Sequence, residues 1–137
     1  MIGVLVVTHG DFGMHLLGAA QTILGPQDQC ESMSVDATLD MNGLLTTLKA
    51  SAVRLDTGDG LIILTDMFGG TPSNISLSLL QPGKIEILTG ANLPMLLKTL
   101  TSRAVGNLNQ LAADAKAAGV QGIVVAGEVL RRKVNEV

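Results

Sequence analysis

A histidine and an aspartate in this 137-residue chain have the types and positions needed for nucleophilic chemistry. His9 follows the apolar run 2–7, and Asp66 follows the apolar run 61–65. A carboxylate that accepts a hydrogen bond from one imidazole nitrogen fixes the tautomer and leaves the lone pair of the other nitrogen free. If these two residues lie side by side, His9 can act as a nucleophile or as a base at neutral pH.

The residues after Asp66 offer a place for an anion. Thr71 followed by Pro72 has the pattern of an N-cap and a first helical residue, so the segment Gly69-Gly70-Thr71-Pro72 predicts the start of a helix. The N-terminus of a helix carries free backbone N–H groups and favours a phosphoryl group. Together with His9, these residues indicate a histidine that carries phosphate. The residue types alone also allow an ordinary loop histidine with satisfied hydrogen bonds.

Other kinds of site fit the sequence less well. The nucleotide-binding P-loop needs Gly-Lys-Ser/Thr, which is absent, and no G-x-G-x-x-G opens a helix after the first apolar run. Thr71 and Ser73 lack the G-x-S-x-G pattern of an α/β-hydrolase and are interpreted as capping or polar helix residues. A metal site of His9, Asp11 and His15 can be drawn, but the helical position of His15 favours an exposed side chain.

A regular alternation of apolar runs and helical patterns must position these residues. Continuous apolar runs predict strands at 2–7, 61–65, 85–88 and 122–126, and a weaker alternation predicts one at 30–36. Apolar residues spaced by three and four predict helices around 16–24, 44–55, 71–80, 94–103 and 107–118. The order indicates an α/β protein with an open, mostly parallel, doubly wound sheet and helices on both faces.

The strand order of such a sheet decides where its site lies. Ligands bind at the carboxyl ends of the strands, in the crevice where the strand order reverses. If strands 30–36 and 61–65 lie on opposite sides of strand 2–7, His9 and Asp66 meet in that crevice. We therefore expect the site to be formed by the residues that follow the runs 2–7 and 61–65.

Composition and charge exclude several classes of protein. Hydrophobic residues make up 47% of the chain and charged residues 15%, which is typical of one folded domain. Nine basic and twelve acidic residues give a net charge of -3, and Phe12 and Phe68 are the only aromatic residues. Nucleic-acid binding is therefore not expected, since it needs a basic surface or stacking side chains.

Cysteine usage and the N-terminus indicate a cytoplasmic protein. Cys30 is the only cysteine and cannot form an intrachain disulfide. The first apolar run is too short for a signal peptide or a membrane-spanning helix. We expect one domain over residues 1–130, followed by a short charged tail over 131–137.

Three motifs in order give the chain a resemblance to a known family. They are Val6-Val7-Thr8-His9-Gly10, the run DMFGGTPSN from Asp66 to Asn74, and Gly90-Ala91-Asn92-Leu93-Pro94-Met95. Over about residues 1–130, the sequence resembles the mannose-type enzyme IIA of the bacterial phosphoenolpyruvate-dependent sugar phosphotransferase system. The phosphoryl-carrying subunit of dihydroxyacetone kinase is similar at the first motif, but it lacks the central Gly-Gly-Thr/Ser-Pro-x-Asn segment.

The resemblance implies a phosphotransferase in which His9 accepts a phosphoryl group from the phosphocarrier protein HPr on Nε2 and passes it to an enzyme IIB. Enzyme IIB phosphorylates sugar entering through a membrane permease, so the chain meets the membrane only indirectly. Asp66 holds Nδ1, and no metal or organic cofactor is expected because the donor arrives already activated. The residues expected to bind phosphate or partner proteins are Thr8, Gly10, Phe68, Gly69, Gly70, Thr71, Ser73 and Asn92.

The run 122–126 predicts an assembly. A strand added at a sheet edge in the same chain leaves its own outer edge exposed, and exchange between two subunits covers that edge. The resemblance likewise implies a homodimer in which this strand is exchanged and runs antiparallel to the others. We expect no IIB domain after the strand, and sugar transport and a purely regulatory role both stay open. A small-molecule binding or hydrolytic domain with His9 as general base is a further alternative.

Overall fold

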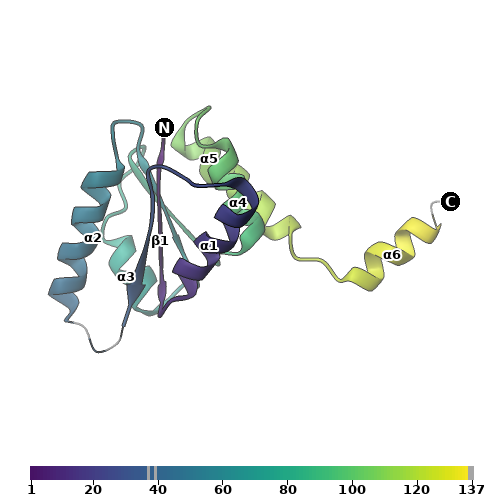
Figure 1. Cartoon of the computed structure of the whole chain (residues 1–137), viewed down its shortest axis with the longest axis horizontal. Coiled ribbons are helices and arrows are strands. Elements are labelled where there is room, and N and C mark those ends of the chain that lie inside the picture. Colours follow the sequence, from purple (N-terminus) through teal and green to yellow (C-terminus); the bar gives the residue numbers. More distant parts are fainter. Residues whose placement is uncertain (37, 39, 136–137) are drawn as a thin grey trace.

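The computed structural model describes residues 1–36, 38 and 40–135, in which strands and helices alternate as far as the fourth strand (Figure 1). Among these residues, none of the helices combines the length and the apolar character required to cross a bilayer. The elements in chain order are β1 (Gly3–His9), α1 (Phe12–Leu24), β2 (Cys30–Val35), α2 (Met41–Leu55), β3 (Leu61–Thr65), α3 (Gly70–Leu77), β4 (Ile85–Thr89), α4 (Leu93–Ser102), α5 (Leu108–Gln121) and α6 (Ala126–Asn135).

The four strands form one sheet in the order β2-β1-β3-β4, and all neighbouring strands run parallel. His9, at the end of β1, pairs with Val35 of β2, and Val7 pairs with Thr65, the last residue of β3. The carboxyl ends of β1, β2 and β3 therefore lie at the same edge. The predicted parallel α/β sheet is confirmed, and β1 lies between β2 and β3 as the site requires.

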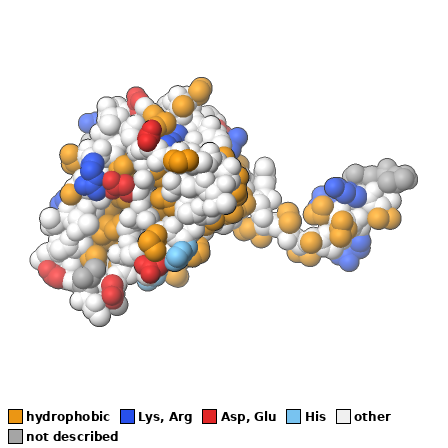
Figure 2. All heavy atoms as spheres, in the orientation of Figure 1, with side chains coloured by type: hydrophobic (Ala, Val, Ile, Leu, Met, Phe, Trp, Pro, Cys, Tyr) orange, Lys and Arg blue, Asp and Glu red, His pale blue; other side chains and the backbone are white. Residues whose placement is uncertain are grey.

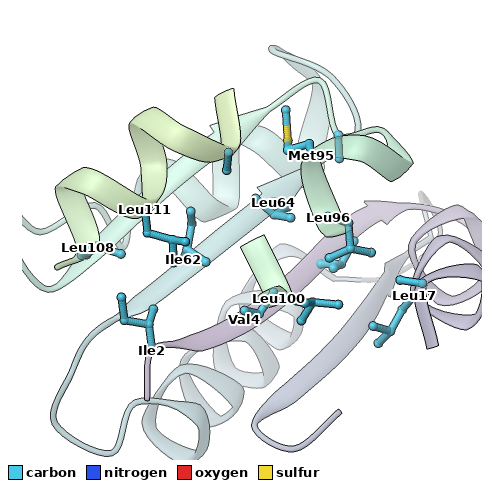
Figure 3. Packing of buried hydrophobic residues seen from close by; sticks show 14 residues of the cluster. Ile2, Val4, Leu17, Ile62, Leu64, Met95, Leu96, Leu100, Leu108 and Leu111 are labelled. Atoms are coloured by element: carbon cyan, nitrogen blue, oxygen red, sulfur yellow. The ribbon is translucent and has the colours of Figure 1, made fainter. Parts of the chain in front are cut away.

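Helices cover both faces of the sheet, which explains why its inner strands are continuously apolar. Successive side chains of a strand point to opposite faces. Val4 and Val6 of β1 therefore belong to one core, and Leu5 and Val7 belong to the other. The first core packs α1, α4 and α5 against the sheet (Figure 3), and the second packs α2 and α3 against its opposite face.

Two predicted helix starts have different outcomes. α4 begins close to the expected place, because Oδ1 of Asn92 accepts a 3.0 Å hydrogen bond from the backbone N–H of Met95. The expected N-cap at Thr71 is wrong, because α3 already begins at Gly70, and Gly69 occupies the capping position without a side-chain hydrogen bond. The N-terminus of α3 thus follows Asp66 more closely in the chain than the sequence predicts.

The expected strand at 122–126 is not formed in the single chain. Gly122 follows α5, residues 123–125 have no regular structure, and Ala126 begins α6. A strand needs a neighbouring strand edge for its backbone hydrogen bonds. This segment instead extends away from the rest of the molecule, with α6 at its end (Figures 1 and 2). The expected charged tail is helical as far as Asn135, within α6, and residues 136 and 137 lie outside the described residues.

Candidate active site

His9 and Asp66 meet at the carboxyl edge of the sheet. His9 is the last residue of β1, and Asp66 directly follows β3. Nδ1 of His9 lies 2.7 Å from Oδ2 of Asp66, and the backbone N–H of His9 donates to the same oxygen at 3.1 Å. The His9 side chain is 51% exposed, whereas that of Asp66 is 17% exposed. The carboxylate thus holds one side of an imidazole that stays accessible to a reaction partner.

Hydrogen bonds from His9 lower the pKa of the Asp66 carboxyl. Burial raises the pKa of this carboxyl, but the side-chain and backbone hydrogen bonds from His9 outweigh burial and hold the pKa below its ordinary value. Asp66 is therefore ionised at neutral pH, and its Oδ2 atom can only accept. Nδ1 must carry the proton of this hydrogen bond, which leaves the lone pair of the neutral His9 ring on Nε2.

The N-terminus of α3 lies against the Nε2 side of the ring. A Cβ atom added at Gly70 would be 3.2 Å from Nε2 and 3.1 Å from Cε1 of His9, so a side chain there would crowd this nitrogen. The first turn of α3 has no side-chain cap, and its Pro72 carries no N–H. The remaining N–H groups of this turn and the positive end of the helix dipole are available to an anion beside Nε2.

Thr8 is fully buried and holds α1 to the end of β1. Its Oγ1 atom accepts a 2.7 Å hydrogen bond from the backbone N–H of Gly13, in the first turn of α1, and donates to the carbonyl oxygen of His9 at 3.2 Å. Asp11, the N-cap residue, makes no side-chain capping bond. Thr8 therefore supplies the cap of α1 and fixes the backbone of His9. The sequence predicts Thr8 as a binding residue, whereas its hydroxyl is used inside the fold.

Gly13 is a supporting residue that the sequence analysis does not single out. An added Cβ atom would lie 3.0 Å from Oγ1 of Thr8 and 3.1 Å from Cγ1 of Val6. α1 can therefore approach β1 this closely only without a side chain at position 13. A glycine in the first turn of an otherwise regular helix is the signal that could have indicated this contact, since glycine is unfavourable there.

Four further candidates differ in their exposure. Gly10 and Phe68 are exposed, and Thr71 is half-buried in the first turn of α3. Ser73 is fully buried, and its hydroxyl has no hydrogen-bond partner among the described residues. The exposed Phe68 ring, two residues after Asp66, is therefore the candidate most available to a partner protein.

The Asn92 side chain has a structural role at the start of α4, and His15 lies on α1. The Asn92 side chain caps α4 and also donates from Nδ2 to the carbonyl oxygen of Gly119 at 3.0 Å, so it connects α4 with the end of α5. His15 is exposed on α1, as the sequence predicts. Within the part of the chain that the structure describes, no three His, Cys, Asp or Glu side chains gather closely enough to hold a metal ion.

A match to a protein family covers most of the chain. Residues 3–116 match the EIIA-man family model, which is described as "PTS system fructose IIA component". The chain belongs to this family. The resemblance carried by the sequence motifs, to a mannose-type enzyme IIA of the sugar phosphotransferase system, is therefore confirmed.

Relatives and solved structures agree with this family. The "PTS system mannose-specific EIIAB component" of Escherichia coli K12 is 30% identical over 124 residues, which is 89% of this chain but only 38% of that protein. The "PTS system fructose-specific EIIA component" of Bacillus subtilis is 27% identical over 96% of this chain and 91% of that protein. The crystal structure of the phosphotransferase system component EIIA from Streptococcus agalactiae has a TM-score of 0.84 at 28% identity, over 93% of this chain and 99% of that one.

Proposed function

We propose that this chain is a phosphoryl carrier of a sugar phosphotransferase system and that His9 is the residue phosphorylated. The observation that carries the proposal is the 2.7 Å contact between Nδ1 of His9 and Oδ2 of Asp66, beside the uncapped N-terminus of α3. Membership of the enzyme IIA family supports the same role. The proposed donor is phosphorylated HPr and the proposed acceptor is an enzyme IIB, with the membrane involved only through permease partners.

The proposed reaction transfers the phosphoryl group between two nucleophiles. The Nε2 lone pair of His9 attacks the phosphorus atom on HPr, and the bond between phosphorus and the donor atom breaks as its electron pair returns to HPr. The His9 ring keeps its Nδ1 proton and gains positive charge, which the ionised Asp66 stabilises. Attack by an acceptor atom of enzyme IIB on the same phosphorus then breaks the Nε2–P bond and restores neutral His9.

Backbone groups are the local means of stabilising the phosphoryl group. The segments that connect each strand to the next helix are 10–11, 36–40, 66–69 and 90–92, and none of them contains lysine or arginine, whereas the first three contain aspartate. The N–H groups at the start of α3 and the helix dipole therefore provide the attraction for the anion. Without a cationic side chain in these segments, the group is held weakly, which suits a carrier that passes it on.

We also propose that two copies form a homodimer by exchanging residues 122–126. Ile123, Val124 and Val125 are exposed, and β4 is an edge strand of the sheet. Pairing of this segment with β4 of a second copy would bury apolar side chains and cover the strand edge at the same time. Light scattering at micromolar concentration should give the mass of a dimer, and a monomeric mass counts against the exchange.

The test of the carrier role is phosphorylation of purified variants by charged HPr. His9→Ala should remain folded, because its side chain is half exposed, and should take up no label. His15→Ala changes the other histidine, which is exposed on α1, and should be labelled like the wild type. The bound phosphate should be labile in acid and stable in base. Label that persists in His9→Ala and disappears in His15→Ala would contradict the assignment.

The fate of the label separates the remaining functions. Discharge of the phosphorylated protein by an enzyme IIB would support a role in sugar transport. A label that forms but that no enzyme IIB removes would indicate a regulatory module. Complete failure to take up phosphate from HPr would favour a binding or hydrolytic domain in which His9 is a base.

A further inference from the structure

We propose that helix α6 of one copy packs into a largely apolar groove of a second copy, between α2 and the segment 78–81 that follows α3. This groove has a volume of about 460 Å³, and its lining includes Ala52 and Val53 of α2, Leu79, Leu80 and Gln81 of the segment, and Ile85 of β4. The inference rests on the strand-exchanged dimer proposed above and adds a second contact to it. The carrier role of His9 does not depend on this contact.

The first observation is that α6 carries an apolar stripe with nothing packed on it in the single chain. Ala126, Val129, Leu130 and Val134 recur at the spacing that places side chains on one face of a helix. Leu130 is 63% exposed, and the described residues of α6 include no buried one. Figure 2 shows orange hydrophobic side chains on the arm that stands clear of the main body. Since a ten-residue helix is marginal alone in water, this stripe needs a surface to cover it.

The second observation is where the arm starts. Nδ2 of Asn92 donates to the carbonyl oxygen of Gly119 at 3.0 Å, and a Cβ atom added at Gly122 would clash with Cγ of Pro94. The end of α5 is thus packed against the start of α4, which follows the carboxyl end of β4. Residues 123–125 therefore leave the molecule at the carboxyl end of the β4 edge.

The third observation is how much of that edge is free. Gln81 already pairs with Ile85 through backbone hydrogen bonds of 3.0 and 2.9 Å, which closes the amino-terminal part of the edge. Among the described residues, the backbone N–H of Ile87 donates only to the Glu86 side chain, at 3.0 Å. Ile87 therefore directs its backbone N–H and C=O groups away from β3, as does Thr89 two residues on. Three residues of an incoming arm match the stretch from Thr89 to Ile87.

These observations determine where α6 of a second copy would lie. An antiparallel arm enters the partner's edge at Thr89, passes Ile87 and reaches the Gln81–Ile85 pair, where the extended segment ends and α6 begins. The groove beside α2 lies at this point, because Gln81 and Ile85 line it. The groove also holds Val53, an apolar side chain that is 80% exposed in the single chain. The apolar stripe of α6 and the apolar groove are therefore brought to the same place.

The first experiment detects the contact by cross-linking between differently tagged copies. In a Cys30→Ala background, Val53→Cys in one copy and Leu130→Cys in the other should be joined by a short bismaleimide. The control replaces Val53→Cys by Val105→Cys, which is 85% exposed in the turn after α4. Efficient cross-linking of the first pair and not of the second is expected. Equal cross-linking of both pairs, or of neither, would overturn the contact.

The second experiment measures the contribution of the groove to assembly. Val53→Asp should raise the dimer dissociation constant about tenfold or more, because the buried apolar contact is lost. Val105→Asp is the matched change of an exposed valine and should leave the constant unchanged. Hydrogen exchange of residues 126–135 should be slowed in the wild-type dimer and fast in the Val53→Asp variant. Both valines are exposed, so neither change should unfold the single chain.

Failure of this inference can be distinguished from failure of the proposed function. A dimer in which the amides of 126–135 exchange freely would overturn the groove contact and leave strand exchange standing. A monomer whose His9 is still phosphorylated would overturn the dimer and the contact together, but not the carrier role. If the α6 amides are protected from exchange only when vesicles of anionic lipid are present, the three basic side chains of α6 bind a membrane surface instead. That result would overturn the inference.

Discussion

Replacement of Gly70 by alanine tests whether open space beside Nε2 of His9 is required for phosphoryl transfer. The added Cβ atom would lie 3.2 Å from Nε2 and 3.1 Å from Cε1. These separations are shorter than the roughly 3.5–4.0 Å at which non-bonded carbon atoms attract each other. A reacting phosphorus atom must come within about 3–3.5 Å of the same nitrogen before the bond forms. The methyl group and the phosphoryl donor therefore compete for one space.

Gly69→Ala is the control that separates crowding from backbone strain. Gly70 has a φ of +81°, where a residue with a side chain costs about 1–2 kcal/mol. Gly69 has a φ of +87° and a ψ of 166°, a region where the cost is about 1–3 kcal/mol. A Cβ atom at Gly69 would meet no other atom within 4 Å. The control therefore has at least comparable strain but leaves Nε2 of His9 free.

The assay compares single-turnover phosphorylation by charged HPr with unfolding in urea. Both variants should lose about 1–3 kcal/mol of unfolding free energy. Only Gly70→Ala should also lose about 10²-fold or more in the transfer rate, because misplacement of a reacting group by about 1 Å has an effect of that size. Equal transfer rates in the two variants, at equal fractions folded, would refute the requirement for open space beside Nε2.

Three further changes have defined outcomes. Asp66→Asn should keep the fold but slow phosphoryl transfer about 10²-fold or more in rapid-mixing kinetics, because an amide can donate to Nδ1 and stabilise the wrong tautomer; Asp11→Asn is the control. Thr8→Val should lower the unfolding free energy in urea by about 1–3 kcal/mol, because the N–H of Gly13 loses its buried acceptor. Burial raises the pKa of the Cys30 thiol from 9.0 to about 11, so the unfolded chain loses this proton first and stability should fall as the pH rises through that interval. Urea titrations of the wild type and Cys30→Ala should diverge there.

Each of these outcomes has a result that contradicts it. Wild-type kinetics in Asp66→Asn would remove Asp66 from the mechanism. Unchanged stability of Thr8→Val would show that the hydrogen bond to Gly13 contributes nothing to the fold. Parallel stability curves for the wild type and Cys30→Ala above pH 9 would show that the thiol titrates equally in the folded and unfolded chains.

The pairing of His9 with Asp66 could be predicted because it follows from strand order. Both residues end apolar runs, and such runs identify strands buried on both faces. Once β1 lies between β2 and β3, the residues after β1 and β3 must share one edge. The glycines after Asp66 likewise indicated an approach of backbone to the site, and Gly70 lies against the His9 ring.

The roles of Thr8 and Asn92 could not be predicted in the same way. Both stand in motifs beside the expected site, and sequence gives no measure of how deeply each side chain is buried or which backbone group it meets. Thr8 is covered by α1, whose close approach depends on Gly13, and Asn92 depends on the packing of α5 against α4. The run 122–126 shows a further limit, because β-branched residues predict a strand whether or not the same chain offers an edge for it.

Nitrogen NMR of the ¹⁵N-histidine-labelled protein, before and after phosphorylation by charged HPr, tests the role of His9 most directly. We expect the Nε2 signal of His9 to shift and to couple to phosphorus, while Nδ1 keeps its proton and its hydrogen bond to Asp66. The signals of His15 should stay unchanged. Phosphorus on Nδ1 of His9, on His15, or on neither ring would contradict His9 Nε2 as the phosphoryl acceptor.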